Sequence, residues 1–148
     1  MKYTTEIVVK IPLEECIAIL NHTANLKHWQ KDLTSYEHIS GTPGTIGNKM
    51  KLNYNINNRK IELTETIMHI NLPHEIYFSY ETKGILNTQK NHFFATPEGH
   101  TKWINENEFS STSFLTRIML ILMPRAFKKQ SKKYLTDFKT FAENKTPI

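Results

Sequence analysis

The sequence predicts an α+β fold in which a curved antiparallel sheet wraps around a long C-terminal helix. Three observations support this prediction. Residues 3–11 alternate and are rich in β-branched side chains, as in a strand. Residues 34–110 keep a period of two between short turn clusters, and residues 127–142 carry an apolar stripe with helical 3–4 spacing. The expected order is one strand, two short helices, six strands and one long helix.

The two short helices follow the first strand. Residues 13–20 place apolar side chains on one helical face, and the polar stretch "NHTAN" ends that helix. Residues 26–33 are long enough only for a short second helix. Its inward face is expected to contain Leu26, Trp29 and Leu33.

The six predicted strands are joined by short turns, which favours an antiparallel meander. The cluster "GTPGTIG" at 41–47 is expected to connect two strands of a hairpin. Asn57 and Asn58 form a pair that is typical of a tight two-residue turn.

The stretch 113–127, "SFLTRIMLILMPRAF", contains six consecutive apolar residues at 118–123, directly before Pro124. Proline lacks the N–H that an interior helical position needs, so Pro124 is expected to kink the long helix or to begin it. We predict that the residues before it form a separate turn or short helix, which acts as an apolar lid over a cavity mouth.

Composition limits the class of protein. A chain of 148 residues predicts a single domain over 1–148. Its one cysteine, Cys16, excludes an intramolecular disulfide and fits a reducing compartment. The N-terminus has no apolar segment typical of a signal peptide, and no run reaches the roughly 18 apolar residues of a membrane-spanning helix. We therefore expect a cytoplasmic protein.

The formal net charge is +5, and the excess lies largely in residues 125–139. Such a cluster is most simply a solvated helix face, but it also fits transient contact with an anionic membrane surface or a partner. Nucleic acid is not expected, because the helix would cover the sheet face on which bases could stack.

Several polar residues fall where strand parity points inward. Asn105 and Asn107 share a face with Trp103 and Phe109, and Glu65 shares one with apolar residues of its own strand. Burying such groups unpaired costs on the order of 1–3 kcal/mol each. One interpretation is a cavity in which they bind one another, water or a ligand. The other is a β-bulge that shifts parity and turns them outward.

The order of these elements over nearly the whole chain resembles the START-like (SRPBCC) superfamily, whose helix-grip fold is also that of the birch-pollen allergen. The resemblance is closest to small bacterial polyketide cyclase/dehydrase-like or coenzyme-Q-binding-like members. It is carried by the segments "EIVVKIPLEECIAIL", "NLKHWQKDL", "GTPGTIGNKM", "RKIELTETI", "LPHEIYFSY", "EGHTKWINENEF" and "KKYLTDFKTFAE". The resemblance implies a deep cavity between the sheet and the C-terminal helix that binds a hydrophobic small molecule or lipid. It does not imply one activity, because members differ in function.

Few catalytic or metal-binding motifs are present. The seven histidines are scattered without metal-ligand spacing, and no metal site or cofactor is expected. Cys16 lies on an apolar helix face, as a small core residue would. Acid–base chemistry remains, with Glu65 as the candidate catalytic residue and Asn105, Asn107 or Tyr80 orienting a substrate.

The predicted function is binding of a hydrophobic small molecule or lipid. One alternative is an enzyme of the polyketide cyclase or dehydratase type in the same pocket, and another is a membrane-surface or partner-binding module. The oligomeric state is not predicted. The expected ligand-binding residues are Trp29, Tyr54, Glu65, Phe78, Tyr80, Phe93, Trp103, Asn105, Asn107, Phe109, Met119 and Met123.

Overall fold

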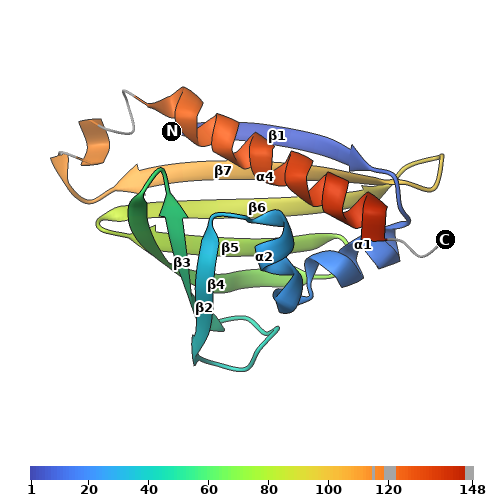
Figure 1. The fold of residues 1–148 in the computed structure, drawn as a ribbon, viewed down its shortest axis with the longest axis horizontal. Helices are drawn as coiled ribbons and strands as arrows, with labels where there is room; N and C mark the ends of the chain where they lie inside the picture. Colours follow the sequence, from blue (N-terminus) through green and yellow to red (C-terminus); the bar gives the residue numbers. More distant parts are fainter. Residues whose placement is uncertain (115, 119–122, 146–148) are drawn as a thin grey trace.

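The structure is a computed structural model that describes residues 1–114, 116–118 and 123–145 (Figure 1). Its elements are β1 (Lys2–Val9), α1 (Leu13–Leu20), η1 (Thr23–Asn25), α2 (Leu26–Trp29), β2 (Leu33–Ser40), β3 (Lys49–Ile56), β4 (Arg59–Asn71), β5 (Glu75–Thr82), β6 (Ile85–Ala95), β7 (Thr101–Ser111) and α4 (Pro124–Lys145). This order confirms the predicted α+β fold.

The described strands form one antiparallel sheet in the order β1-β7-β6-β5-β4-β3-β2. Neighbours from β2 to β7 are consecutive in the chain, and β1 joins the far edge beside β7. The sheet bends strongly, so that β2 and β3 cross the view of Figure 1 almost at right angles to β6 and β7. Helices α1, α2 and α4 lie over the concave face.

The predicted turn between β3 and β4 is confirmed. Asn57 and Asn58 have φ angles of 52° and 64°. Two successive residues in the left-handed region match the twist of a two-residue hairpin, and asparagine tolerates that region better than most side chains.

Strand parity places the predicted polar residues on the concave face. Asn105 and Asn107 are only 1% and 3% exposed. In β4, the register shift lies between Ile67 and His69, beyond Glu65. No bulge therefore intervenes to turn Glu65 outward, and the inward interpretation is correct.

The predicted second helix is too long. Helix α2 ends at Trp29, and Gln30 leaves the helical region with φ −105° and ψ 80°. Leu33 is buried, as predicted, but it belongs to β2, where it pairs with Tyr54 of β3. The sheet offers the backbone of this segment partners that a lone helical turn lacks, and this tertiary pairing outweighs the local helical pattern.

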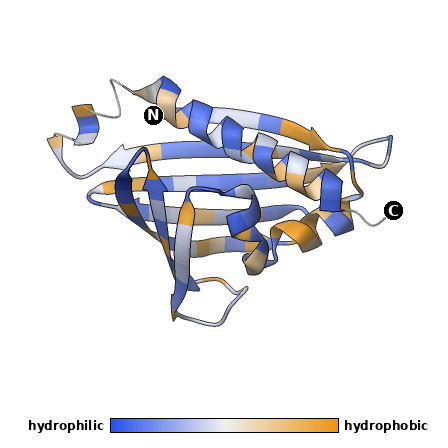
Figure 2. Cartoon of the chain, in the orientation of Figure 1, coloured by the Kyte–Doolittle hydropathy of each residue, from blue (hydrophilic) through white to orange (hydrophobic). Residues whose placement is uncertain are grey.

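Helix α4 begins at Pro124, so of the two predicted roles of this proline, kinking the long helix or beginning it, the structure shows the second. The outward side of α4 is largely hydrophilic (Figure 2). Its inward side enters a core whose fully buried members include Val9, Phe93 and Phe138. The predicted lid covers residues 118–123, of which 119–122 lie outside the described residues.

Candidate functional site

A cavity of about 930 Å³ lies between the concave face of the sheet and helices α1, α2 and α4. Exposed Arg59 and Lys60, the first residues of β4, and exposed Lys83, from the turn after β5, border it at one end. We call this the open end. At the packed end, Trp29, Trp103 and Phe138 fill the space in edge-to-face contacts, with ring centroids 5.3 and 5.4 Å from Phe138.

Most of the residues expected to contact a ligand border this cavity, although contact with a ligand remains a prediction. They are Trp29, Tyr54, Glu65, Phe78, Tyr80, Trp103, Asn105, Asn107 and Phe109. They come from α2, β3, β4, β5 and β7, and the curvature of the sheet brings them together.

Two of the expected residues lie elsewhere, and one is outside the described part of the chain. Phe93 is fully buried in the core, with its ring 5.6 Å from that of Trp103, so the Trp103 ring stands at the cavity wall in its place. Met123 is 50% exposed just before α4 and does not border the cavity. Met119 falls outside the described residues.

The sequence analysis missed three polar residues of the site, Asn87, Gln89 and Asn91 of β6. A signal was available, because they alternate in step with Phe93, which had already been expected to point inward. On the sheet they pair with the inward residues of β7 in register, Asn87 with Phe109, Gln89 with Asn107 and Asn91 with Asn105.

Five carboxamides thus share one surface, which we call the carboxamide wall. It consists of Asn87, Gln89, Asn91, Asn105 and Asn107. The amide of Asn107 donates to Asn105 Oδ1 at 2.5 Å, and that of Asn105 donates to Asn91 Oδ1 at 2.8 Å. The chain of bonds ends at the packed end, where the Trp103 indole N–H donates to Asn91 Oδ1 at 2.9 Å.

The network explains how so much polarity is kept inside. Asn87 and Gln89 both donate to Asn107 Oδ1, at 3.2 and 3.4 Å, and Asn91 donates to the Ile76 carbonyl at 3.2 Å. A buried carboxamide without such partners would cost on the order of 1–3 kcal/mol. The wall is therefore held in place by its own hydrogen bonds, and it carries no formal charge.

Glu65 is the one carboxyl group that borders the cavity within the described residues. It lies directly across from Tyr80 on the neighbouring strand, and the two side chains are hydrogen-bonded. Burial raises the pKa of Glu65 to about 7, although the bond from Tyr80 acts in the opposite direction. Protein surrounds Glu65, and its carboxyl group faces the cavity, so near neutral pH it can both donate and accept a proton.

Tyrosine hydroxyls accompany this carboxyl group. The Tyr54 hydroxyl donates to Gln30 Oε1 at 2.7 Å. Burial holds the pKa values of Tyr54 and Tyr80 well above their usual range, and the charge of Glu65 adds to this effect. Both hydroxyls therefore stay protonated and serve as hydrogen-bond donors.

Trp29, at the packed end, is 5% exposed, and its indole N–H is buried without a hydrogen-bond partner among the described residues. Its ring is held edge-on against Tyr134 and Phe138. Aromatic packing therefore keeps this side chain in place despite the unsatisfied donor.

Nucleophilic and metal-binding groups are not gathered at the site in the part of the chain that the structure describes. Cys16 is fully buried on α1, and burial raises the pKa of its thiol to about 11, which disfavours the reactive thiolate. Across the described ranges, no group of three or more His, Cys, Asp or Glu side chains is arranged to hold a metal ion.

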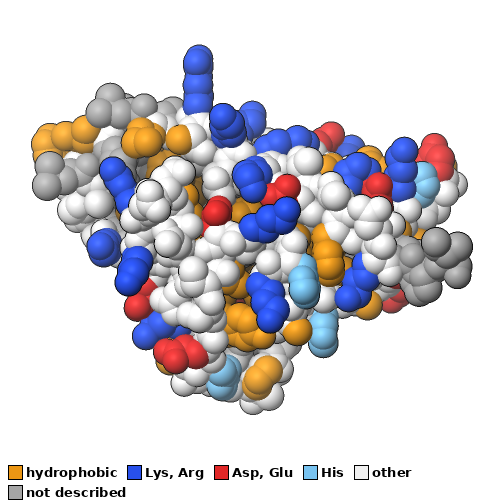
Figure 3. Space-filling model, in the orientation of Figure 1, with side chains coloured by type: hydrophobic (Ala, Val, Ile, Leu, Met, Phe, Trp, Pro, Cys, Tyr) orange, Lys and Arg blue, Asp and Glu red, His pale blue; other side chains and the backbone are white. Residues whose placement is uncertain are grey.

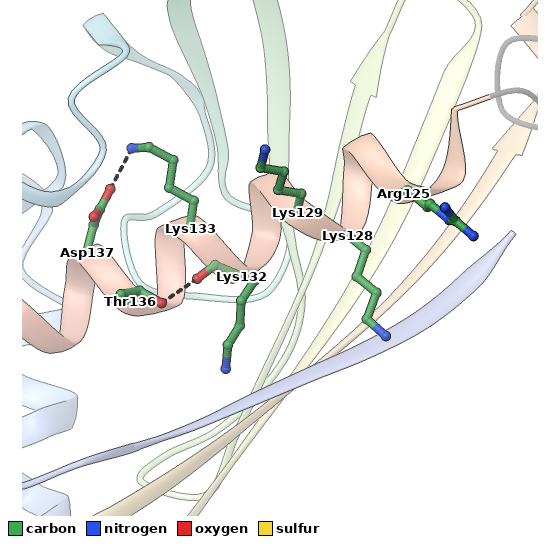
Figure 4. A pocket seen from close by; sticks show the side chains of 7 residues that line it. All are labelled: Arg125, Lys128, Lys129, Lys132, Lys133, Thr136 and Asp137. Carbon is green, nitrogen blue, oxygen red and sulfur yellow. Dashed lines mark hydrogen bonds and ion pairs between the residues drawn. The ribbon is translucent and has the colours of Figure 1, made fainter.

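The exposed side of α4 carries the predicted basic cluster. Arg125, Lys128 and Lys129 have no hydrogen-bond or ion-pair partner among the described residues, and Figure 4 shows them extending away from the helix. Lys132, in contrast, donates to the Glu6 carbonyl at 2.5 Å, and Lys133 lies 2.7 Å from Asp137. Figure 3 shows that Lys and Arg side chains are spread over the whole of this face of the molecule.

No helix within the described ranges is both long and apolar enough to cross a membrane.

Comparisons with known proteins show similarity in structure but not in sequence. No protein-family model matches the sequence, and no curated protein matches it. Among solved structures, the ZhuI aromatase/cyclase from Streptomyces sp. R1128 has a TM-score of 0.81 at 11% identity, over 100% of this chain and 96% of that one. The protein TTHA0849 from Thermus thermophilus has a TM-score of 0.80 at 12% identity, over 99% of this chain and 100% of that one.

A third solved structure, that of Ara h 8.0201, has a TM-score of 0.76 at 11% identity, over 96% of this chain and 97% of that one. TM-scores of this size show a common fold, and identities this low leave the activity open. The sheet order, the covering α4 and these three likenesses agree with one another. The chain therefore has a helix-grip fold, as these three solved structures do.

Proposed function

We propose that this protein binds a hydrophobic small molecule or lipid in the cavity between the sheet and α4. The observation that carries the proposal is the cavity itself, whose volume of about 930 Å³ falls within the range of small-molecule sites. Its wall is mostly apolar, with a few polar groups gathered at defined places. Such a wall gains free energy from covering apolar ligand surface, and its polar groups can orient the ligand.

Mass spectrometry of the purified protein under native and denaturing conditions tests this proposal. We expect a bound lipophile that is released on denaturation, or uptake of a neutral apolar dye such as N-phenyl-1-naphthylamine. Leu63→Trp should fill part of the cavity and weaken dye binding at least tenfold. Met68→Trp is the matched control, because Met68 is on the same strand, 53% exposed and outside the cavity wall. Equal dye binding by both variants would contradict the proposal.

The second candidate function is acid–base catalysis of the cyclase or dehydratase type. The observation that favours it is the Glu65–Tyr80 pair, because a carboxyl group with a pKa of about 7 can move a proton at neutral pH. Turnover of polyketone substrates should then disappear in Glu65→Gln. It should persist in Glu62→Gln, which changes an exposed carboxylate on the same strand. Equal rates for both variants would exclude Glu65 as the catalytic residue.

Contact with an anionic membrane is the third candidate. Phe114 and Met123 are 75% and 50% exposed, and they flank Thr116, which borders the cavity. Lys128 and Lys129, which have no ion-pair partner among the described residues, follow near the start of α4. Apolar side chains can insert into a lipid surface, and neighbouring cations are attracted to anionic headgroups. Sedimentation with phosphatidylserine vesicles should fall with salt and in Lys128→Ser/Lys129→Ser, and it should change less in Lys133→Ser, whose cation is already paired with Asp137.

A further inference from the structure

The carboxamide wall keeps three amide N–H groups without a partner among the described residues, beside acceptor capacity at the amide oxygens of Asn87 and Gln89. The amide oxygens of Asn91, Asn105 and Asn107 each accept two hydrogen bonds, so their usual capacity is filled. Each of the amide nitrogens of Gln89, Asn105 and Asn107 donates only one bond within the described residues. Since an amide nitrogen carries two hydrogens, each of these residues keeps one N–H to offer.

The distribution of charge along the cavity restricts the ligand further. Among the described residues, the cations that border the cavity are Arg59, Lys60 and Lys83, and all three are exposed at the open end. The carboxamide wall itself has no cation, and Glu65 lies two strands away from β6 in the sheet order. A carboxylate or phosphate bound at the wall would lose its hydration without gaining a counter-charge, which is costly. A neutral oxygen atom meets no such penalty.

From these two observations we propose that the carboxamide wall recognises carbonyl or hydroxyl oxygens of an uncharged, otherwise apolar ligand. The inference rests on the proposed ligand-binding function and names the ligand class: a neutral oxygenated ring system or ketone rather than a hydrocarbon or a ligand whose charged group lies at the wall. The wall donates hydrogen bonds to the ligand oxygens, and the apolar residues of β3 to β5 and α4 cover its carbon frame. A hydrocarbon of the same shape would leave the spare N–H groups without partners and without water.

Matched ligands test this directly, with displacement of N-phenyl-1-naphthylamine as the measurement. The ligands are 9,10-anthraquinone, anthracene and anthraquinone-2-carboxylate, which share one tricyclic frame. Two or more hydrogen bonds of about 1 kcal/mol each predict that the quinone binds at least tenfold more tightly than anthracene. The carboxylate should bind more weakly than the quinone.

Two variants test whether the preference for the quinone over anthracene depends on the carboxamide wall. Gln89→Leu removes a half-buried amide near the cavity surface, and Asn107→Leu removes the amide at the centre of the network. In either variant the preference for the quinone should fall to threefold or less, while anthracene binding stays within threefold of the parent. Asn55→Leu, an exposed residue of β3, is the control and should keep the full preference. If Asn107→Leu fails to fold, Gln89→Leu still decides the matter.

The outcomes separate this inference from the function on which it rests. Equal binding of quinone and anthracene, or a preference that survives Gln89→Leu, overturns the inference and leaves ligand binding intact. If neither the dye nor any of the three ligands binds, the proposed function fails and the inference fails with it.

Discussion

The two ends of α4 face the same sheet but different surroundings. Near its C-terminal half, Phe138 is fully buried between the rings of Trp29 and Trp103. Near its start, Phe127 borders the cavity, and its ring centroid lies 4.9 Å from that of Phe109. Both phenylalanines belong to one apolar stripe of one helix. A continuous stripe therefore does not tell whether the space in front of it is filled, because this depends on the side chains opposite.

The side chains opposite explain the difference. At the packed end the sheet presents two large rings, Phe93 and Trp103, which belong to one buried cluster with Phe138 of α4, and the Trp103 ring contacts Phe138 edge-on. Toward the open end the same strands present Asn105, Asn107 and Asn87, which are shorter and bond to one another instead of reaching the helix. The strongly curved sheet leaves a gap that these side chains do not fill. We infer that the packed end carries most of the stability and that the open end is adapted to a ligand.

The largest expected effect tests the packed end. Phe138→Ala should lower the free energy of unfolding by about 3–5 kcal/mol, because it removes a fully enclosed ring and leaves a cavity. Urea unfolding followed by circular dichroism measures this loss. A loss below about 1 kcal/mol would mean that the two ends do not differ as described.

A smaller effect concerns Glu65 and depends on pH. Its pKa is about 7 in the folded chain against 4.5 as the ordinary value, so the folded state holds the proton more tightly. Below pH 4.5 both states are protonated. The stability of the parent then falls as pH rises from about 4.5 to about 7, and the loss is complete above that range. Glu65→Gln should therefore be more stable than the parent by about 1–3 kcal/mol at pH 8, and by much less at pH 4.5.

The control for this measurement is Glu62→Gln, on the exposed face of the same strand. Its difference from the parent should be similar at both pH values. If the gain in Glu65→Gln does not shrink between pH 8 and pH 4.5, the carboxyl group is not held in an environment that favours its neutral form.

The next effect tests the open end with the same substitution on the same helix. Phe127→Ala should cost only about 1 kcal/mol, because Phe127 is half-buried and already borders open space. Comparing its unfolding curve with that of Phe138→Ala holds residue type and helix constant. Similar losses in the two variants would show that the open end is as tightly packed as the other.

The smallest effect is expected outside the cavity. Lys133 pairs with Asp137 at 2.7 Å on the exposed side of α4. Lys133→Met should change the free energy of unfolding by about 0.3–0.5 kcal/mol, since water and salt screen such i,i+4 pairs. Thermal unfolding in low and high salt measures this, and the difference from the parent should shrink as salt rises. A loss above about 1 kcal/mol would indicate that the pair has a structural role.

Much of the candidate site could be predicted from strand parity. The alternation around Asn105 and Asn107 placed them on the inward face, and the pattern around Glu65 did the same for that carboxyl group. The same rule applied to β6 would have found Asn87, Gln89 and Asn91. Parity could not distinguish Phe93 from its neighbour Trp103, because both point inward and only packing decides which ring stands at the cavity wall.

By itself, the sequence determined the order of the elements, the alternation of side chains between the two faces of the sheet, and that Pro124 must either begin the long helix or kink it. These follow from periodicity and from the covalent structure of proline, which act over a few residues. Only the tertiary structure decided where the sheet bends, where α2 ends, which half of the concave face is filled and that Glu65 bonds to Tyr80. These properties depend on contacts between residues far apart in the chain, and their geometry is fixed only when the sheet and α4 pack together.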